Sequence, residues 1–400
     1  MYYRQPRYFK DFQCIGGTCP SSCCMGWRID WTQEEIDKIK NAPNCPQELR
    51  ELCDKSFAYN ESSKKFSVVL EEKRCPFLTE DNFCKIQREM GAEYLSYTCR
   101  VYPRNYVIAE PALYAHCRMS CPEIMKHILN NDKATDLVNI RPRVEKVVSV
   151  ISTNDEVIKK HPEMKFRYDL FEFFYETISD KRYSVEDSII LCALAAQSLA
   201  KLVEQNEIDR IPEAIKTLKA QMHNKSQLNS IENIKPNYHI KLGILGQTLQ
   251  AVCKLTNNIN TTFSLTDNSG RFNIDLYTAG EEVLSAYIKK KPFVMRNIAL
   301  NLLMELCVPF KNHDFTIFEN FMFYAACFAL VKLNTIAIAE IQNRADDELS
   351  AVFDMERYII KSVAMISRVL CQNTEVDKLI MEILRGNKML SPAYLALLVK

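Results

Sequence analysis

Apolar residues recur three and four positions apart along most of the chain after about residue 135. The pattern is clear in 167–178, 186–205 and 208–222, and this spacing places the apolar side chains on one face of an α-helix. It recurs in five further segments, namely 237–255, 279–290, 292–307, 317–341 and 354–371. The chain has only nine glycines, which disfavours a loop-rich β protein. We therefore predict a large helical region.

The most apolar stretch is FMFYAACFALV at 321–331, and Lys332 ends it. A membrane-spanning helix needs about 20 apolar residues, so we predict a buried helix and no membrane partner. The N-terminus carries charges at positions 4, 7, 10 and 11 and has no apolar run, so it does not resemble a signal peptide. We expect a cytoplasmic protein.

The balance of positive and negative residues indicates which partners the protein does not attract. Lys and Arg number 51 against 50 for Asp and Glu, and a balanced chain has no general attraction to nucleic acid. We expect no nucleic-acid partner. The 400 residues are 47% hydrophobic, enough for a sizeable core and for two domains.

Cysteine is concentrated near the N-terminus, where eleven of the sixteen lie within the first 121 residues. Because the cytosol keeps most thiols reduced, metal binding explains them better than disulfides do. Nine fall into three motif groups: Cys14, Cys19, Cys23 and Cys24; then Cys75 and Cys84; then Cys99, Cys117 and Cys121. The sequence predicts a mainly α fold, with a cysteine-rich metal-binding module at 1–135 that has little β structure, such as a strand at 65–72, and a helical domain at 136–400.

The spacing of the thiols favours one type of metal centre over another. CxxxCP at 117–122 has the spacing that ends a bacterial ferredoxin cluster loop, and the chain lacks the two CxxC pairs of a common zinc site. We expect an iron–sulfur cluster of the 4Fe–4S type, with zinc as the alternative. Cys23 and Cys24 are adjacent, so they should not both bind the same ion. One of them could bind a second metal or simply pack in the protein.

The other cysteines and the histidines have simpler interpretations. Cysteines on apolar helical faces usually act as small hydrophobic core residues, and five here do so: Cys192, Cys253, Cys307, Cys327 and Cys371. Cys45 and Cys53 lie outside the motifs and are interpreted as structural or surface thiols. Among the histidines, His116 is a weak candidate ligand because it adjoins Cys117.

Four stretches together resemble a known family. QPRYFKDFQCIGGTCPSSCCMGWRI, RCPFLTEDNFCKIQREMG, LSYTCRVYPRNY and CRMSCPE are similar to the successive motifs of the flagellin lysine-N-methylase family, related in its cysteines to iron- or zinc-chelating CxxCxxCC proteins. The resemblance covers roughly residues 3–125. It implies methyl transfer from S-adenosylmethionine to lysine ε-amines of flagellin, with an iron–sulfur cluster bound by the cysteine module.

The residues themselves leave the mechanism open between polar and radical transfer. No GxGxxG loop can be written, and no CxxxCxxC occurs, because Gly26 and Ile124 stand where a third cysteine would be needed. A non-enzymatic metal-binding adaptor and an electron-transfer protein stay as alternatives.

Polar transfer would require the site to lower the pKa of the lysine, either by desolvating the ammonium or by placing a base nearby. The sequence does not choose among the candidate bases Tyr97, Tyr102, Asp30 and Glu93. Arg100 and Arg104 could bind an anionic group of the cofactor, since guanidinium donors match a carboxylate. Alternatively, their segment is a chelating turn in which these charges are incidental.

Overall fold

The computed structural model describes residues 1–26, 29–61, 64–142, 149–150, 155–222, 225–256, 262–345 and 354–400. Most of its elements are helices, which confirms the predicted mainly α fold. The α-helices are α1 (Tyr8–Asp11), α2 (Gln33–Lys40), α3 (Gln47–Ser56), α4 (Lys85–Glu89), α5 (Tyr97–Val101), α6 (Pro122–Asn130), α7 (Asp155–Lys160), α8 (Arg167–Ser179), α9 (Val185–Glu204), α10 (Ile211–Gln221), α11 (Lys225–Glu232), α12 (Tyr238–Thr256), α13 (Ile274–Lys290), α14 (Val294–Glu305), α15 (Ile317–Arg344), α17 (Met355–Gln372), α18 (Thr374–Gly386) and α19 (Pro392–Val399).

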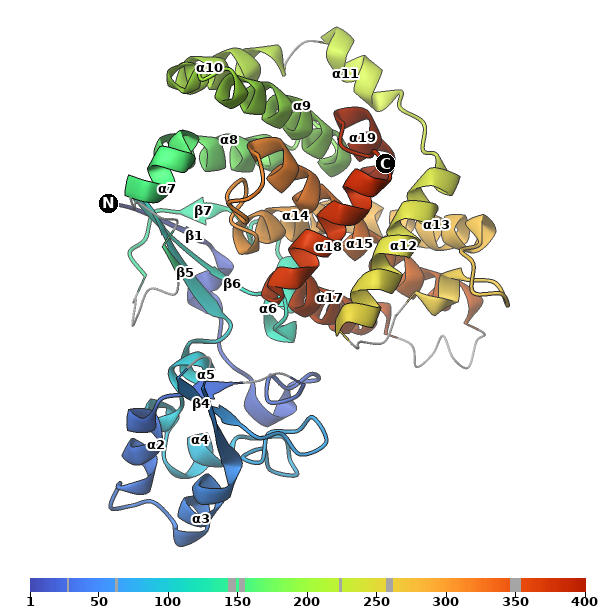
Figure 1. Ribbon diagram of the computed structural model, residues 1–400. Coiled ribbons are helices and arrows are strands. Elements are labelled where there is room, and N and C mark those ends of the chain that lie inside the picture. Colours follow the sequence, from blue (N-terminus) through green and yellow to red (C-terminus); the bar gives the residue numbers. More distant parts are fainter. Residues whose placement is uncertain are drawn as a thin grey trace.

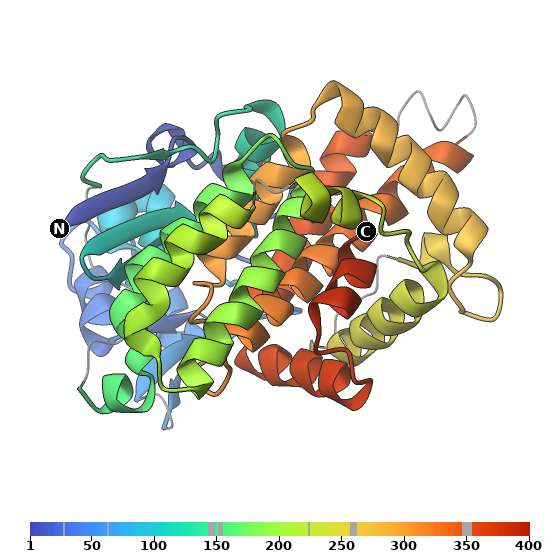
Figure 2. The same ribbon diagram turned by 90° about the horizontal axis from the view of Figure 1, so that it is seen from above.

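Helix α15 forms the centre of the main core. Its residues are almost all buried from Ile317 to Glu340, and α9, α13, α17 and α19 pack around it (Figure 2). Thr316 and Glu319 form a capping box that starts the helix. Among the described residues it is the one helix long and apolar enough to cross a membrane, but its whole apolar window is buried inside the protein. The prediction of a buried helix at 321–331 is confirmed.

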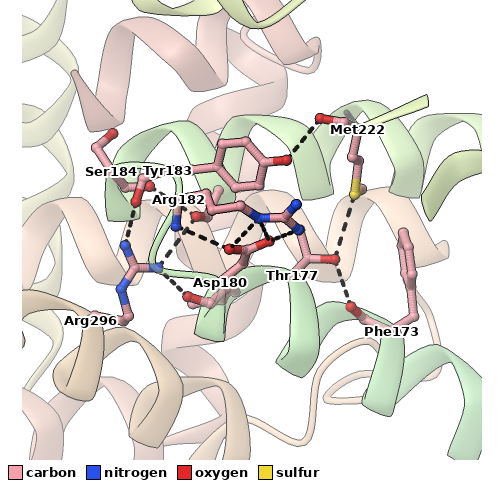
Figure 3. Close-up of polar contacts among 10 residues, drawn as sticks. Phe173, Thr177, Asp180, Arg182, Tyr183, Ser184, Met222 and Arg296 are labelled. Carbon is pink, nitrogen blue, oxygen red and sulfur yellow. Dashed lines mark hydrogen bonds and ion pairs between the residues drawn. The ribbon is translucent and has the colours of Figure 1, made fainter. Parts of the chain in front are cut away.

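The turn between α8 and α9 shows how buried polar groups fix the helices (Figure 3). The Arg296 guanidinium of α14 donates to the backbone carbonyls of Ile178 and Tyr183. The Tyr183 hydroxyl donates to the carbonyl of Met222 at 2.9 Å, and Ser184 caps α9. These contacts satisfy backbone carbonyls near the ends of α8 and α10 and in the turn, and an N–H group at the start of α9.

A five-stranded mixed sheet packs on the helices at one side of the main core. Its order is β7-β1-β6-β5-β8, with β1 (Tyr2–Pro6), β5 (Arg104–Ala109), β6 (Ala112–Cys117), β7 (Leu137–Val138) and β8 (Ser149–Val150). Strands β5 and β6 form a hairpin, and β1 joins β6 in parallel with Tyr2 opposite Ala112. The sequence pattern predicted no such sheet.

A second, smaller domain lies apart from the helical body, below it in Figure 1. It contains α2 to α5 and a three-stranded sheet of order β2-β4-β3, with β2 (Asp30–Trp31), β3 (Phe57–Asn60) and β4 (Lys65–Val68). The strand predicted at 65–72 coincides in part with β4. Its separate hydrophobic core includes Trp31, Leu49 and Phe77.

The two cores divide the chain differently from the predicted boundary at residue 135. Buried residues between Ile29 and Leu95 form the small core. Tyr8, Phe9, Phe12 and the segment from Val101 to Leu129 pack with the helices in the main core. The N-terminal sequence therefore contributes to both bodies, and the chain passes between them in the segments that carry cysteine motifs.

Candidate functional site

Seven of the nine motif cysteines line one cavity of about 170 Å³. They are Cys14, Cys19, Cys23, Cys24, Cys84, Cys99 and Cys121. Cys84 and Cys99 pack against the small core, whereas Cys121 belongs to the main core. The cavity therefore lies at the junction of the two bodies, where α5 approaches the rest of the molecule (Figure 1).

The two remaining motif cysteines lie outside the lining of this cavity. Cys75 is buried in the small core, and its backbone N–H donates to the Cys24 carbonyl at 2.9 Å. Cys117 is fully buried in the main core, and its N–H donates to the Tyr8 hydroxyl at 3.1 Å.

The adjacent thiols Cys23 and Cys24 differ in their protonation. A hydrogen bond from Cys23 lowers the pKa of Cys24 to about 7, with Ser22 and Arg74 acting in the same direction against burial. The same hydrogen bond, together with burial, raises the pKa of Cys23 well above its usual value. Of the two thiols, Cys24 therefore loses its proton more readily, and the thiolate is the form that binds metal and reacts.

Burial raises the pKa of most other thiols at the junction. It raises that of Cys75 and Cys121 to about 12 and that of Cys84 to about 11. A thiol must lose its proton to bind a metal, so metal uptake here would release protons.

The donor set suits a thiolate-bound metal, but the sulfurs are not arranged around one point. In the part of the chain that the structure describes, no three side chains of His, Cys, Asp or Glu are grouped closely enough to hold an ion. Thiolate is nevertheless a preferred ligand of zinc and of iron–sulfur clusters.

Both predicted arginines lie at this cavity. The Arg104 guanidinium donates to the carbonyl of Phe12 at 3.1 Å and lies 4.9 Å from the centroid of its ring. Arg100 extends from α5, beside Cys99. A site for a drug-sized ligand usually has about 300–1,000 Å³, so this cavity would accommodate only the reactive end of a large cofactor.

Of the four candidate bases, the structure places only Tyr102 at the cavity. Its hydroxyl lies 3.0 Å from that of Ser120, and burial raises its pKa. Asp30 accepts a hydrogen bond from Ser67 in the small sheet. Glu93 is exposed, and the backbone N–H of Tyr97 donates to the Glu35 carboxylate.

Sequence reasoning missed Glu123, the one carboxylate among the residues that line the cavity. Its side chain pairs with Lys126 at 2.9 Å. Its position two residues after Cys121, in the motif CPE, was the available signal.

His116 does not approach the cysteine cavity. Burial lowers its pKa to about 3, and its Nε2 lies 3.3 Å from the Asn105 amide nitrogen. It lines a separate small cavity with Arg167 and Phe171. Cys45 and Cys53 are buried in the small core, in agreement with their interpretation as structural thiols.

The fold and site together define a mainly helical protein with a cysteine-lined cavity at the junction of its two hydrophobic cores. Residues 171–398 match the model of the FliB lysine N-methylase C-terminal domain. Because this match covers more than half of the chain, the protein belongs to the FliB lysine N-methylase family.

Comparison with known proteins finds three similar bacterial sequences. The flagellar biosynthetic protein FliU of Salmonella muenchen is 28% identical over 138 residues, which cover 33% of this chain and 80% of the relative. The lysine-N-methylases of Salmonella choleraesuis (strain SC-B67) and Salmonella typhimurium (strain LT2) are 26% and 28% identical over 147 and 138 residues. These matches cover 33% of this chain and about a third of each methylase. No solved structure matches significantly.

Proposed function

We propose that this protein methylates lysine ε-amines of flagellin in the cytoplasm, with S-adenosylmethionine as the methyl donor and an iron–sulfur cluster at the junction cavity. The observation that carries the proposal is the gathering of seven motif thiols around one cavity, next to the domain that the lysine N-methylase family shares. The names of the relatives support lysine methylation and a flagellar role.

The chemistry requires a neutral lysine amine. The ε-nitrogen lone pair forms a bond to the methyl carbon while the bond between that carbon and the sulfonium sulfur breaks, and the ammonium must first release a proton. Burial of the ammonium at the junction would lower its pKa, since desolvation disfavours the charged form. Glu123, the carboxylate in the lining of the cavity, would receive the proton.

The cofactor would extend beyond the cavity. Arg100 and Arg104 are placed at the lining to bind its carboxylate through guanidinium donors. When bound, an iron–sulfur cluster would supply a site for a sulfur or oxygen ligand, or an electron. The thiols of Cys14, Cys19 and Cys121, which line the cavity, would hold it.

The test is methylation of purified flagellin. The metal-replete protein is incubated with S-adenosylmethionine and flagellin, with and without a reductant, and flagellin lysines are analysed by mass spectrometry. We expect added methyl groups, and their loss in Cys19→Ser and Cys121→Ser, while Cys253→Ser in α12 stays active. Circular dichroism checks that each variant is folded. Absence of methylation under both conditions would refute the proposal.

A further inference from the structure

A small cavity of about 20 Å³ lies between the five-stranded sheet and the helical body. Strands β5 and β6 form one wall, the start of α8 forms a second, and the end of α14 with the segment after it forms the third. Most of the lining side chains are apolar, such as Val107, Phe171 and Val308. Two lining side chains carry nitrogen, those of His116 and Arg167.

The His116 ring has an N–H group without a partner. The residue is only 1% exposed, and the amide nitrogen of Asn105 lies 3.3 Å from its Nε2. An amide nitrogen can only donate, so Nε2 accepts and the hydrogen of the neutral ring lies on Nδ1. This Nδ1 is buried and has no hydrogen-bond partner among the residues that the structure describes.

Arg167 has a second N–H group of the same kind. Its side chain is 7% exposed, and Nη1 donates to the Met164 carbonyl at 2.9 Å. Its Nε is buried and, within the described part of the chain, has no hydrogen-bond partner. Two buried N–H groups, one from the sheet and one from α8, therefore lack an acceptor at the same cavity.

The charge of Arg167 is only weakly balanced. Among the described residues, the one carboxylate within 4 Å of its guanidinium is that of exposed Glu110, 3.9 Å from Nη2, which is beyond hydrogen-bond distance. Burial lowers the pKa of Arg167 against the attraction of Glu110, but a guanidinium keeps its charge in proteins. The cavity is therefore a place where a negative charge would be stabilised.

The lining suits an anion better than a water molecule. A water also has two hydrogens to donate, and the lining includes no carboxylate or side-chain amide to accept them. The hydroxyl of Tyr114, another lining residue, already donates to Glu172 at 3.0 Å. An anion would instead accept from both N–H groups and balance the guanidinium, and apolar walls strengthen that attraction.

The size of the cavity restricts the anion to a single atom. A cavity needs about 10–15 Å³ to hold one water-sized group, and this one has about 20 Å³. Phosphate, sulfate and carboxylates have several heavy atoms and would not fit. A chloride or bromide ion is the class of anion that does.

We propose that His116 and Arg167 bind one halide ion, chloride in the first instance, between the β5–β6 hairpin and the start of α8. Nδ1 of His116 and Nε of Arg167 would donate to the ion. The bound halide would thus join the sheet to the helical body and stabilise the packing of one on the other. The site is separate from the cysteine cavity, and it does not depend on the proposed function.

Thermal unfolding of the full-length protein tests the site in solution. Sodium chloride and sodium bromide are compared at equal ionic strength with sodium gluconate, whose anion is too large for the cavity. We expect a saturable rise in melting temperature of about 2–5 °C with either halide and none with gluconate, because a ligand that binds only the folded state stabilises it.

Substitutions then assign the effect to the two donors. Arg167→Met and His116→Phe should each lose the halide-dependent rise. Arg182→Met is the matched control, since Arg182 is exposed and pairs with Asp180 at the surface, and it should respond like the wild type.

Bromide in crystals of the wild-type protein gives a measurement that does not depend on the folding of any variant. Diffraction at the bromine absorption edge should show an anomalous peak between His116 and Arg167. The absence of that peak, or equal melting temperatures in chloride and gluconate, would show that the cavity does not take a halide and would overturn the proposal. A halide response that persists in both Arg167→Met and His116→Phe would place the ion elsewhere and overturn it as well.

Discussion

The carboxylate of Glu305, buried at the end of α14, accepts a hydrogen bond from the backbone N–H of Met119. Asn301, one turn earlier, donates to the Cys117 carbonyl at 3.1 Å and to Glu305 at 2.8 Å. The family's C-terminal domain thus holds the backbone between two motif cysteines, and this suggests how the helical body positions one wall of the cavity.

Replacement of Glu305 tests this link. Glu305→Ala leaves the buried N–H of Met119 without a partner, which typically costs about 1–3 kcal/mol. We expect a lower melting temperature and reduced iron content. Glu305→Gln keeps an oxygen acceptor and should retain the iron. Equal iron content in wild type and the alanine variant would show that the link does not position the metal centre.

The same carboxyl makes stability depend on pH. Burial raises the pKa of Glu305 to about 7, from a usual value of 4.5. Between these values the folded state binds more protons than the unfolded state, so this group lowers the free energy of unfolding as pH rises. The glutamine of Glu305→Gln does not titrate. Between pH 4.5 and 8 the free energy of unfolding of this variant, relative to that of the wild type, should therefore rise by up to about 3 kcal/mol. Urea unfolding across this range measures the difference, and parallel curves would contradict the prediction.

Lys241 should make stability depend on pH in the opposite direction. Its amine has no hydrogen-bond partner among the residues that the structure describes, and it lies 5.3 Å from the centroid of the Tyr277 ring. Burial, with repulsion from Lys332, lowers its pKa from 10.5 to about 7, against the attraction of Glu281 and Glu186. The unfolded state binds more protons between these values, so this group raises stability as pH rises from about 7 to 10.5.

Lys241→Met removes the buried amine and keeps the apolar stem. We expect its free energy of unfolding to exceed that of the wild type by a few kcal/mol at pH 6, and this difference should shrink towards pH 10. Lys254→Met, at an exposed position of the same helix, is the matched control and should change little. A gain for Lys241→Met that does not vary with pH would contradict the low pKa.

Two helical glycines should respond oppositely to alanine. A Cβ at Gly280 in α13 would lie 2.6 Å from the Ile336 carbonyl oxygen of α15, whereas one at Gly243 in α12 meets no atom within 4 Å. Gly280→Ala should cost about 1–3 kcal/mol through overpacking, despite its better helix propensity. Gly243→Ala should add about 0.5–1 kcal/mol. Thermal unfolding compares them, and a stabilised Gly280→Ala would exclude the close packing of α13 on α15.

Cofactor binding tests the role of Arg100. Loss of a hydrogen bond to a charged group costs about 1.5–3 kcal/mol, so Arg100→Ala should weaken S-adenosylmethionine binding about 10- to 100-fold. Arg88→Ala, in the same small domain but outside the cavity lining, should bind normally. Calorimetric titration gives both affinities, and an unchanged affinity for Arg100→Ala would place the cofactor carboxylate elsewhere.

The sequence alone was sufficient to predict the helices and to recognise the family resemblance. Apolar spacing is a local property, so segments such as 186–205 and 317–341 could be recognised as α9 and α15. The cysteine motifs likewise needed only short spacings, and the resemblance that they carry agrees with the family match over 171–398.

Tertiary structure decided the sheet and the grouping of the thiols. Tyr2 pairs with Ala112 across more than a hundred residues, and strands this short carry too little local pattern to predict. In the same way, Cys75 packs with Cys24 rather than lining the cavity with Cys121. Motif spacing could show that nine thiols suit metal, but only the separation of two hydrophobic cores decided which of them lie together, because long-range packing is absent from any local pattern.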